Sequence, residues 1–248
     1  MNAAGFHLVM PMGGRGSRFS ECGYAQPKPL IQLEGKPFFF WAVQSVRKFI
    51  EPASITFVVL EEHCAQWQMD TVIRTFYPNA AVTIIPKTLP GPVWTCLKGV
   101  ERANDSAPIL FNDCDHLFKC SVLNKRLASA APWDFDAGLL TFESTQPQFG
   151  YVRYDAERRI IGTAEKEAVS DRAICGAYLF KNAEVFRRAV DQYVSVPRAS
   201  EHFMSGVYNT LCDLGARIEE FPVDFHVNFG TPEEYEQARN APFFTQLV

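Results

Sequence analysis

A glycine-rich stretch near the start of the chain, residues 12–18 (MGGRGSR), combines small residues with two cations. Three glycines within four positions let the backbone turn sharply and bring several N–H groups close to one anion. The stretch lacks the Gly-Lys-Ser/Thr ending of a Walker A loop, and Phe19 stands where the dinucleotide-binding motif needs its third glycine. The pattern therefore indicates a phosphate-binding loop of another kind, with an ordinary strand-to-helix turn as the alternative.

Lys28 follows this stretch and lies between two prolines, Pro27 and Pro29. Prolines on both sides fix the backbone around the lysine and exclude a regular helix there. A second short motif, residues 35–37 (GKP), begins seven positions after Lys28. A lysine held this rigidly suits contact with a phosphate better than an open surface.

Two carboxylates, Asp113 and Asp115, flank Cys114 directly after an apolar segment. α/β sheets bind their ligands beyond the carboxyl ends of their strands, which is where this segment would place them. Carboxylate oxygens suit Mg²⁺ or Mn²⁺ better than zinc. A metal site is the sharper interpretation, and a solvated acidic turn is the alternative.

Apolar and amphipathic segments alternate along the first half of the chain. They predict strands at 6–11, 54–60, 81–85 and 108–111, and helices at 36–50, 61–76 and 92–104. This order predicts a mostly parallel sheet with helices on both faces, a three-layer α/β/α sandwich. The glycine-rich stretch and the two aspartates then lie at the same edge of the sheet.

The second half of the chain has a different pattern, which predicts a mixed sheet with some antiparallel pairs. Strands are expected at 135–142, 150–154, 160–164 and 173–180, and helices at 183–193 and 200–214. A last helix begins after Thr231, where the sequence TPEE predicts a capping box with Glu234. Because no linker or repeat separates the halves, we expect a single domain over residues 1–248.

Composition excludes several classes of protein. Of the 248 residues, 47% are hydrophobic and 21% charged, which excludes a disordered chain, a collagen and a coiled coil. The net charge of −4 supplies no basic field, so we expect no nucleic-acid or membrane partner. The beginning of the chain does not have the pattern of a signal peptide, and seven scattered cysteines predict free thiols in the cytoplasm.

The combined pattern GGRGSR(x)8PKPL(x)4GKP resembles the signature of the nucleotidyltransferases that activate sugar 1-phosphates, such as glucose-1-phosphate thymidylyltransferase and mannose-1-phosphate guanylyltransferase. Later segments resemble that family in the same order, at residues 88–101, 108–118, 149–167, 175–180 and 229–238. The resemblance implies the GT-A-like fold of nucleotide-diphospho-sugar transferases. It also implies a nucleotide-binding half, up to about residue 120, and an acceptor-binding half, about 121–248.

On the nucleotide side, the resemblance implies that backbone amides at Gly13, Gly14 and Gly16 hold the phosphates of an NTP. Gly91 and Thr95 would read the edge of the base. The implied catalytic residues are Arg18, which would bind the triphosphate and the departing pyrophosphate, and Lys28, which would neutralise charge on the reacting phosphates. Fixed cations and amides at the non-bridging oxygens supply most of the catalysis in such reactions, and no protein nucleophile is required.

For the metal, the resemblance implies Asp115 as the main Mg²⁺ ligand, because residues 115–118 (DHLF) fit the family register. Asp113 would help from beside it. Asn228 stands where the family pattern Asp-x-Gly-Thr has its aspartate. This departure puts a neutral amide at the second ligand position.

On the acceptor side, the resemblance implies that Glu165 accepts hydrogen bonds from sugar hydroxyls and that Lys166 contacts the acceptor phosphate. Gly150 and Gly176 would let the sugar approach the backbone, although either could equally mark a bulge. A polar cluster further on either faces the acceptor or is solvated; its members are Glu201, Ser205, Tyr208 and Asn209.

The implied reaction transfers NMP from an NTP to a sugar 1-phosphate, releasing pyrophosphate and forming an NDP-sugar for polysaccharide or glycoconjugate biosynthesis. Phosphocholine or another small phosphate is an alternative acceptor. A glycosyltransferase that binds an NDP-sugar through residues 113–115, and a non-catalytic nucleotide-sensing relative, are the alternative functions. The base, the acceptor and assembly into a homo-oligomer stay open.

Overall fold

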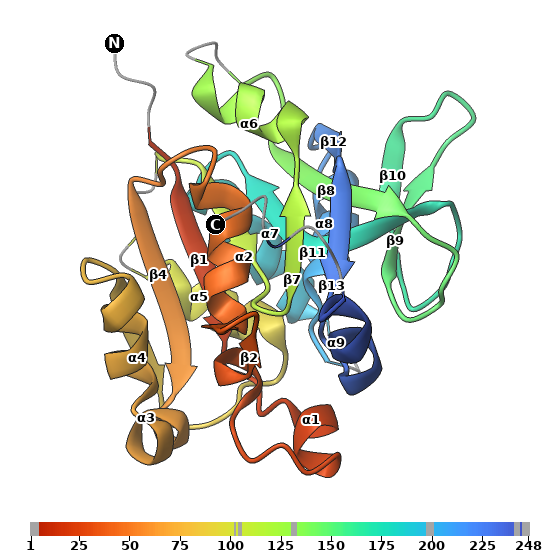
Figure 1. Cartoon of the computed structure of the whole chain (residues 1–248). Helices are drawn as coiled ribbons and strands as arrows, with labels where there is room; N and C mark the ends of the chain where they lie inside the picture. The colour runs from red at the N-terminus through yellow and green to blue at the C-terminus, as the bar shows by residue number, and fades with distance from the viewer. Residues whose placement is uncertain are drawn as a thin grey trace.

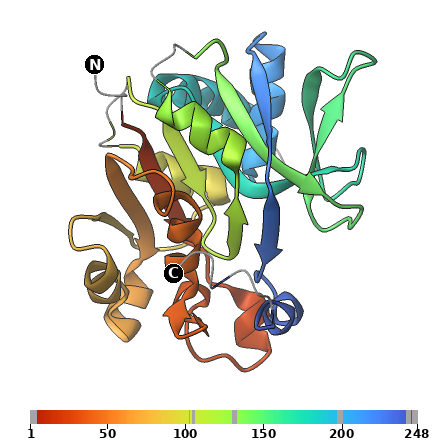
Figure 2. The ribbon, with the colours of Figure 1, turned by 45° about the horizontal axis from the view of Figure 1, so that its top comes forward.

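The computed structural model describes residues 5–101, 103, 106–129, 133–196, 201–240 and 244. A nine-stranded mixed sheet runs through the molecule, with helices on both of its faces (Figure 1 and Figure 2). Strands from both halves of the chain share this sheet, in the order β10-β9-β11-β6-β1-β4-β5, with β8 paired to β11 and β12 paired to β8. The mixed α/β/α architecture predicted from the sequence is confirmed.

The first half of the chain forms the parallel part of the sheet. β1 pairs in parallel with β4 and with β6, and β4 pairs in parallel with β5. The bounds are His7–Met12 for β1, Ser54–Leu60 for β4, Ala81–Ile85 for β5 and Ile109–Asn112 for β6. The strand ends that carry the glycine-rich stretch and the aspartates are therefore neighbours.

The second half adds antiparallel strands through β11 (Arg172–Phe180), which pairs with β6. β11 also pairs with β8 and β9, and β9 forms a hairpin with β10 that projects from the body of the molecule (Figure 1). The bounds of the remaining strands are Ala137–Glu143 for β8, Gly150–Tyr154 for β9, Ile160–Glu165 for β10 and Ile218–Pro222 for β12. The antiparallel pairs predicted for this half are confirmed.

The alternation of buried side chains along β1 creates the two helical layers. Leu8 and Met10 pack with the helices of one face: α2 (Phe38–Arg47), α4 (Met69–Phe76) and α6 (Ser121–Ala128). Val9 packs with those of the other: α5 (Pro92–Gly99), α7 (Ala183–Ser195) and α8 (Met204–Asp213). In the described part of the chain, no helix is long and apolar enough to cross a membrane.

The helix predicted at 61–76 is wrong as a single element. It is split into α3 (Glu61–Trp67) and α4 by Gln68, whose φ of 50° lies in the left-handed region. Three other predicted helices are shorter than expected: α2 begins after Pro37, α5 ends at Gly99, and α8 begins at Met204. The predicted positions 102, 104 and 200 lie outside the described residues.

Several elements of the described chain were not expected from the sequence. β7 (His116–Lys119) and β13 (Phe225–Asn228) pair antiparallel in a small separate sheet, although 105 or more residues separate their pairing partners along the chain. α1 (Ser17–Glu21), α6 and β12 were not expected either. Short strands β2 (Gln32–Leu33) and β3 (Lys36–Pro37) also pair, and β3 occupies the first two positions of the helix predicted at 36–50.

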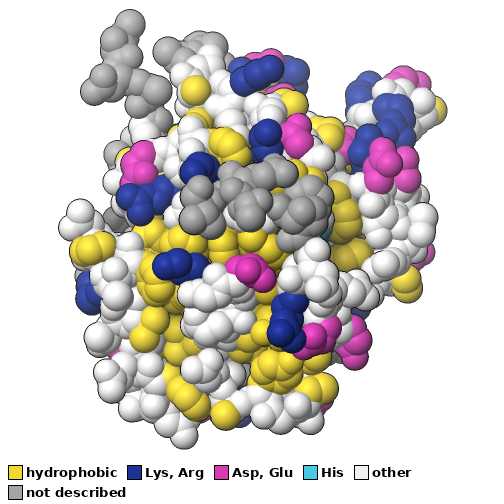
Figure 3. All heavy atoms as spheres, in the orientation of Figure 1, with side chains coloured by type: hydrophobic (Ala, Val, Ile, Leu, Met, Phe, Trp, Pro, Cys, Tyr) yellow, Lys and Arg dark blue, Asp and Glu magenta, His cyan; other side chains and the backbone are white. Residues whose placement is uncertain are grey.

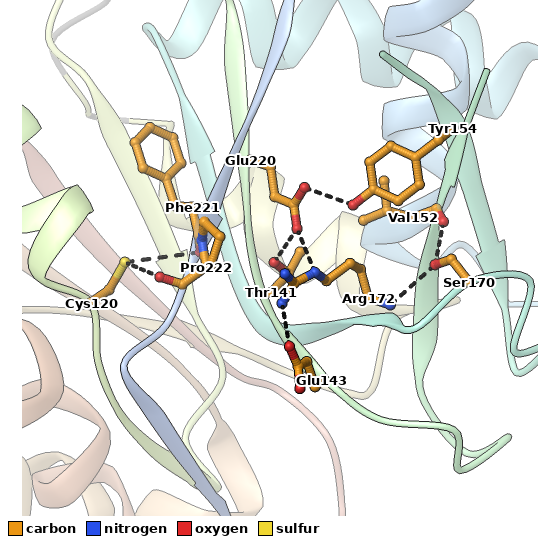
Figure 4. Close-up of polar contacts among 10 residues, drawn as sticks. All are labelled: Cys120, Thr141, Glu143, Val152, Tyr154, Ser170, Arg172, Glu220, Phe221 and Pro222. Carbon is orange, nitrogen blue, oxygen red and sulfur yellow. Dashed lines mark hydrogen bonds and ion pairs between the residues drawn. The ribbon is translucent and has the colours of Figure 1, made fainter. Parts of the chain in front are cut away.

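A polar cluster centred on Glu220 joins the strands of the second half (Figure 4). The Glu220 carboxylate accepts hydrogen bonds from Thr141 Oγ1 at 2.6 Å and from the Tyr154 hydroxyl at 2.7 Å. Arg172 Nε lies 3.6 Å from the same carboxylate, and its Nη1 lies 3.6 Å from Glu143. Burial and the contact with Glu220 raise the pKa of Tyr154, so its hydroxyl keeps its proton and remains a donor. The cluster ties β8, β9, β11 and β12 together.

Replacing Glu220 by alanine should lower the free energy of unfolding by about 3 kcal/mol, since it removes two hydrogen bonds to a charged acceptor and leaves Arg172 without that partner. Chemical denaturation followed by circular dichroism measures this change. Glu219→Ala is the matched control, because its side chain points to the opposite face of β12, and it should change stability by less than about 0.5 kcal/mol. Equal effects of the two substitutions would contradict the role given to the cluster.

Charge on the surface is mixed. On the face drawn in Figure 3, positive and negative side chains are interspersed, and hydrophobic side chains gather on the lower part of that face. Lys36, whose ammonium lies 5.5 Å from the ring centroids of both Phe40 and Phe76, covers part of the apolar surface with its side chain. Because this face has no field of one sign, a phosphate must be bound by charged groups gathered in a local site.

Candidate active site

The glycine-rich loop joins β1 to α1 and lies against Lys28. Gly16 has a φ of 67°, and a Cβ built there would lie 2.7 Å from Lys28 Cβ. Gly13 lies close to Thr95, since a Cβ built on it would lie 3.0 Å from Thr95 Oγ1. Glycine is needed at both positions because side chains would push the loop away from its neighbours.

Lys28 begins the 3₁₀ turn Lys28–Leu30 and donates a hydrogen bond from Nζ to Asp115 Oδ2 at 2.7 Å. Both side chains are largely buried, with 26% and 20% of their surface exposed. Burial by itself would lower the pKa of Lys28, but the Asp115 carboxylate raises it above its usual value. Lys28 therefore carries a fixed positive charge at the strand ends.

The two aspartates differ in their electrostatic surroundings. Burial would raise the pKa of Asp115, but the charge and hydrogen bond of Lys28 hold it below its usual value. Burial raises the pKa of Asp113 to about 7, with a contribution from the Asp115 charge. Asp115 is thus ionised at neutral pH. Asp113 is only partly ionised at that pH, and a further cation nearby would favour its ionised form.

These groups border a cavity of about 520 Å³. Its walls come from residues 11–17, from Lys28 and Pro29, from residues 113–115, and from the segment that leads into α5, including Gly91 and Thr95. The segments predicted to bind the nucleotide are thus brought together, although about 80 positions separate Gly13 from Thr95 along the chain.

The segment around Gly91 is seated against residues 201–203. His202 N donates to Pro90 O at 3.2 Å, and Val93 N donates to His202 O at 3.2 Å. Gly91 has a φ of 131°, and a Cβ there would lie 2.6 Å from His202 N. The glycine is therefore required by this close backbone contact, and its role toward a base stays a prediction.

The three predicted metal ligands gather at a smaller cavity of about 150 Å³, lined by Asp113, Asp115, Asn228, Gly150 and Gly176 among others. A Cβ on Gly230 would lie 2.5 Å from Asp115 Oδ2 and 3.4 Å from Asn228 Oδ1. A Cβ on Gly176, whose φ is 78°, would lie 2.9 Å from Asp113 Oδ2. The absence of side chains at Gly176 and Gly230 thus leaves space for these carboxylate and amide oxygens.

The donor set is two carboxylates and one amide. Within the described ranges, no group of three or more His, Cys, Asp and Glu side chains is arranged to hold a metal ion. Mg²⁺ is commonly held by one or two carboxylates together with the phosphates of its substrate, so these oxygens fit that ion and do not form a complete protein cage.

Asn228 is fixed by Glu234 of α9 (Pro232–Ala238). Its Nδ2 donates to Glu234 Oε1 at 2.6 Å, which leaves Oδ1 as the atom available to the site. Glu234 also completes the predicted capping box with Thr231, which is confirmed. Backbone pairing of β13 with β7, and the hydrogen bond from Phe229 N to Asp115 O, place Asn228 beside the aspartates.

Two histidines, His116 and His226, connect the strand that follows Asp115 with the strand that carries Asn228. Asn112 donates its amide to Ala42 O, so its Oδ1 accepts from His116 Nε2, 2.8 Å away. His116 Nδ1 then accepts from His226 Nε2 at 3.3 Å. Burial lowers the pKa of His116 to about 4 and that of His226 well below its usual value, so both are neutral. They join β7 to β13.

The acceptor-side residues are brought together in part. Glu165 Oε2 accepts a hydrogen bond from Ser205 Oγ at 2.6 Å, and a Cβ on Gly150 would lie 3.1 Å from the same oxygen. Glu165 lines a cavity of about 250 Å³ with Ser205, Asn209 and Glu201, and Glu201 also borders the larger cavity. The two cavities therefore adjoin at Glu201.

Tyr208 and Asn209, which were predicted to form a polar cluster with Glu201 and Ser205, make contacts within the fold. The buried Tyr208 hydroxyl donates into the core, 2.8 Å from Gly138 O, and Asn209 Oδ1 accepts from Thr163 N at 2.7 Å. Lys166 has a φ of 57° and places its ammonium 5.3 Å from the Phe203 ring centroid. The described residues that line the cavity beside Glu165 do not include Lys166, whose phosphate contact stays a prediction.

The two arginines of the glycine-rich loop have different positions. Arg15 lines the larger cavity, whereas Arg18 is exposed on α1 and is not among the described residues that border the cavity. The left-handed turn at Gly16 separates them. The sequence motif predicts a role for Arg18 and none for Arg15, whose one signal in the sequence is its place between two glycines.

A glycine-rich loop, a fixed lysine and paired carboxylates at the strand ends of an α/β sheet define a protein that handles phosphorylated nucleotides. The nucleotidyl transferase family model matches residues 8–241, and the chain belongs to that family. It is a nucleotidyltransferase, and the resemblance seen in the sequence is confirmed. No curated protein matches the chain by sequence.

Solved structures share the fold at low identity. A nucleoside-diphosphate-sugar pyrophosphorylase from Vibrio cholerae RC9 is 22% identical, with a TM-score of 0.79 over 94% of this chain and 100% of that one. An inositol-1-phosphate CTP transferase from T. maritima is 16% identical, with a TM-score of 0.75 over 96% of each chain. A putative glucose-1-phosphate thymidylyltransferase from Bacillus anthracis is 18% identical, with a TM-score of 0.75 over 98% of each chain.

Proposed function

We propose that the protein transfers a nucleotidyl group from an NTP to a sugar 1-phosphate, releasing pyrophosphate and forming an NDP-sugar. The observation that carries the proposal is the Lys28–Asp115 contact, 2.7 Å long, on the wall of a cavity that the glycine-rich loop also borders. The cavity beside Glu165 adjoins it at Glu201 and supplies a place for the acceptor. Of the three similar solved structures, two are named as sugar-nucleotide enzymes and one as an inositol-1-phosphate enzyme.

The chain's own residues then have distinct tasks. Loop amides of Gly13, Gly14 and Gly16 bind the phosphates, and Lys28 neutralises charge that develops on the reacting phosphate. Glu165, oriented by Ser205, accepts hydrogen bonds from acceptor hydroxyls. Asp113, Asp115 and Asn228 would hold Mg²⁺ or Mn²⁺, which when bound would neutralise phosphate charge.

The setting of this reaction is part of the same proposal. We place the protein in the cytoplasm, where its seven free cysteines stay reduced, as one domain that supplies precursors for polysaccharide or glycoconjugate synthesis. Strands of both halves share one sheet, which supports the single domain.

A pyrophosphate-release screen tests the proposal. Four NTPs are combined with a panel of sugar 1-phosphates, inositol 1-phosphate and phosphocholine, with and without Mg²⁺. We expect release that requires one NTP, one sugar 1-phosphate and the metal together. Release with phosphocholine alone would replace the acceptor, and no release from the folded protein with any pair would overturn the proposed reaction.

A further inference from the structure

Arg15 presents a charge to the nucleotide cavity at a loop position outside the residues proposed above for catalysis. It borders the cavity of about 520 Å³ together with Gly14, Gly16 and Lys28. Its Nε donates to Glu62 Oε1 at 3.1 Å, and Glu62 lies in the first turn of α3, directly after β4. The loop is therefore tied to the neighbouring strand end by one ion pair.

Arg15 can exchange Glu62 for another anion, because this ion pair is weak. The side chains of Arg15 and Glu62 are 66% and 49% exposed, so water and salt screen their attraction. A phosphate offers a guanidinium two parallel charge-assisted hydrogen bonds and more negative charge than one carboxylate. An anion that reaches the cavity would thus compete successfully for Arg15.

Lys28, the other cation among the described residues that line the cavity, is already engaged. Lys28 donates to Asp115 and is fixed near the aspartates, where the α-phosphate would react. The two outer phosphates of an NTP need a positive group further along the loop. Among the described residues that line the cavity, Arg15 meets this need, whereas Arg18, to which the resemblance gives that contact, does not border it.

We propose that Arg15 binds the β- and γ-phosphates, which leave as pyrophosphate, and that Glu62 holds Arg15 away from them until the triphosphate arrives. The inference rests on the proposed function, because it names a group for the leaving pyrophosphate of that reaction. Binding the triphosphate breaks the ion pair between Arg15 and Glu62 and forms a pair between Arg15 and phosphate.

Titration calorimetry on the full chain tests this, with magnesium pyrophosphate as the probe because its binding does not depend on the base. Arg15→Ala should weaken pyrophosphate binding about tenfold, since a charge-assisted bidentate contact is lost. Glu62→Gln should tighten it about threefold by releasing Arg15. In the double variant, the effect of Glu62→Gln should vanish. A nucleoside monophosphate should bind all variants within about twofold of wild type, since it lacks the outer phosphates.

The matched control is the exposed pair of Arg47 and Glu51, which lies outside the residues that line the cavity. Arg47→Ala and Glu51→Gln should leave pyrophosphate binding unchanged. If Glu62→Gln tightens binding equally with Arg15 absent, general charge is the cause and the proposal is overturned.

The outcome also separates this proposal from the proposed function. Unchanged pyrophosphate affinity in Arg15→Ala, from a protein that releases pyrophosphate in the screen, would overturn the role of Arg15 alone. A folded wild-type protein that neither binds nor releases pyrophosphate would overturn both.

Discussion

Asp115→Ala should lower kcat/KM for pyrophosphate release by at least about 10³-fold while the protein stays folded. Removal of one preorganised group costs about 10²–10³-fold, and Asp115 serves two purposes, because it orients Lys28 and offers an oxygen to the metal. Asp113→Ala should cost less, since Asp113 has no contact with Lys28 of the kind made by Asp115. Pyrophosphate release over a Mg²⁺ titration measures both losses.

Asp115→Asn is the matched variant for this prediction. Its amide oxygen still accepts the hydrogen bond from Lys28, but the negative charge is gone. If charge at this position matters, Asp115→Asn should lose nearly as much activity as Asp115→Ala, and its thermal unfolding should stay close to wild type. A folded Asp115→Ala protein that turns over normally would show that the metal assignment is mistaken.

The strands of the sheet were predictable because the local sequence of each one is typical of a strand. Residues 54–60 and 81–85 are short runs rich in β-branched residues, and both form strands with the expected bounds. The capping box at Thr231 was equally local, since it needs only the spacing to Glu234. The helix over 61–76 failed because Gln68 adopts a left-handed backbone, and no residue type there demands one.

The candidate site was predictable in its members and less so in their geometry. The motifs led to Lys28 and Asp115, which the structure places in contact. The orientation of Arg15 and Arg18 depends on the turn at Gly16, which a list of residues does not reveal. Asn228 looked like a weakened ligand, yet its amide also donates to Glu234, a contact that an aspartate would replace with repulsion. That requirement arises from a tertiary contact between β13 and α9.

The histidine pair shows the same limit. His116 and His226 are 110 positions apart and meet only because β7 pairs with β13. Nothing in the local sequence predicts that pairing, since both strands are four residues long and only one of them is largely buried. Long-range pairing of short strands is decided by packing and not by propensity.

Lys28→Ala should lower kcat/KM by at least about 10²–10³-fold, with the larger effect on kcat. Lys28 is held by flanking prolines, by the close approach of Gly16 and by Asp115, so its charge is in place before the substrate arrives. A fixed cation stabilises most strongly the charge that grows in the transition state, and its loss costs about 3–4 kcal/mol. Initial rates of pyrophosphate release over a range of NTP concentrations separate kcat from KM.

Lys36→Ala is the control for this last prediction, because Lys36 belongs to the same sequence pattern but packs over Phe40 and Phe76 instead of bordering the cavity. Its rate should stay within about twofold of wild type, since no substrate charge faces it. Arg18→Ala, assayed beside it, decides the role that the sequence assigned to that residue: a loss of about 10²-fold or more would mean that Arg18 acts on the substrate although it lies outside the described cavity lining. If Lys28→Ala were no more impaired than Lys36→Ala, the fixed ammonium would have no part in catalysis, and the Lys28–Asp115 contact would be a structural ion pair.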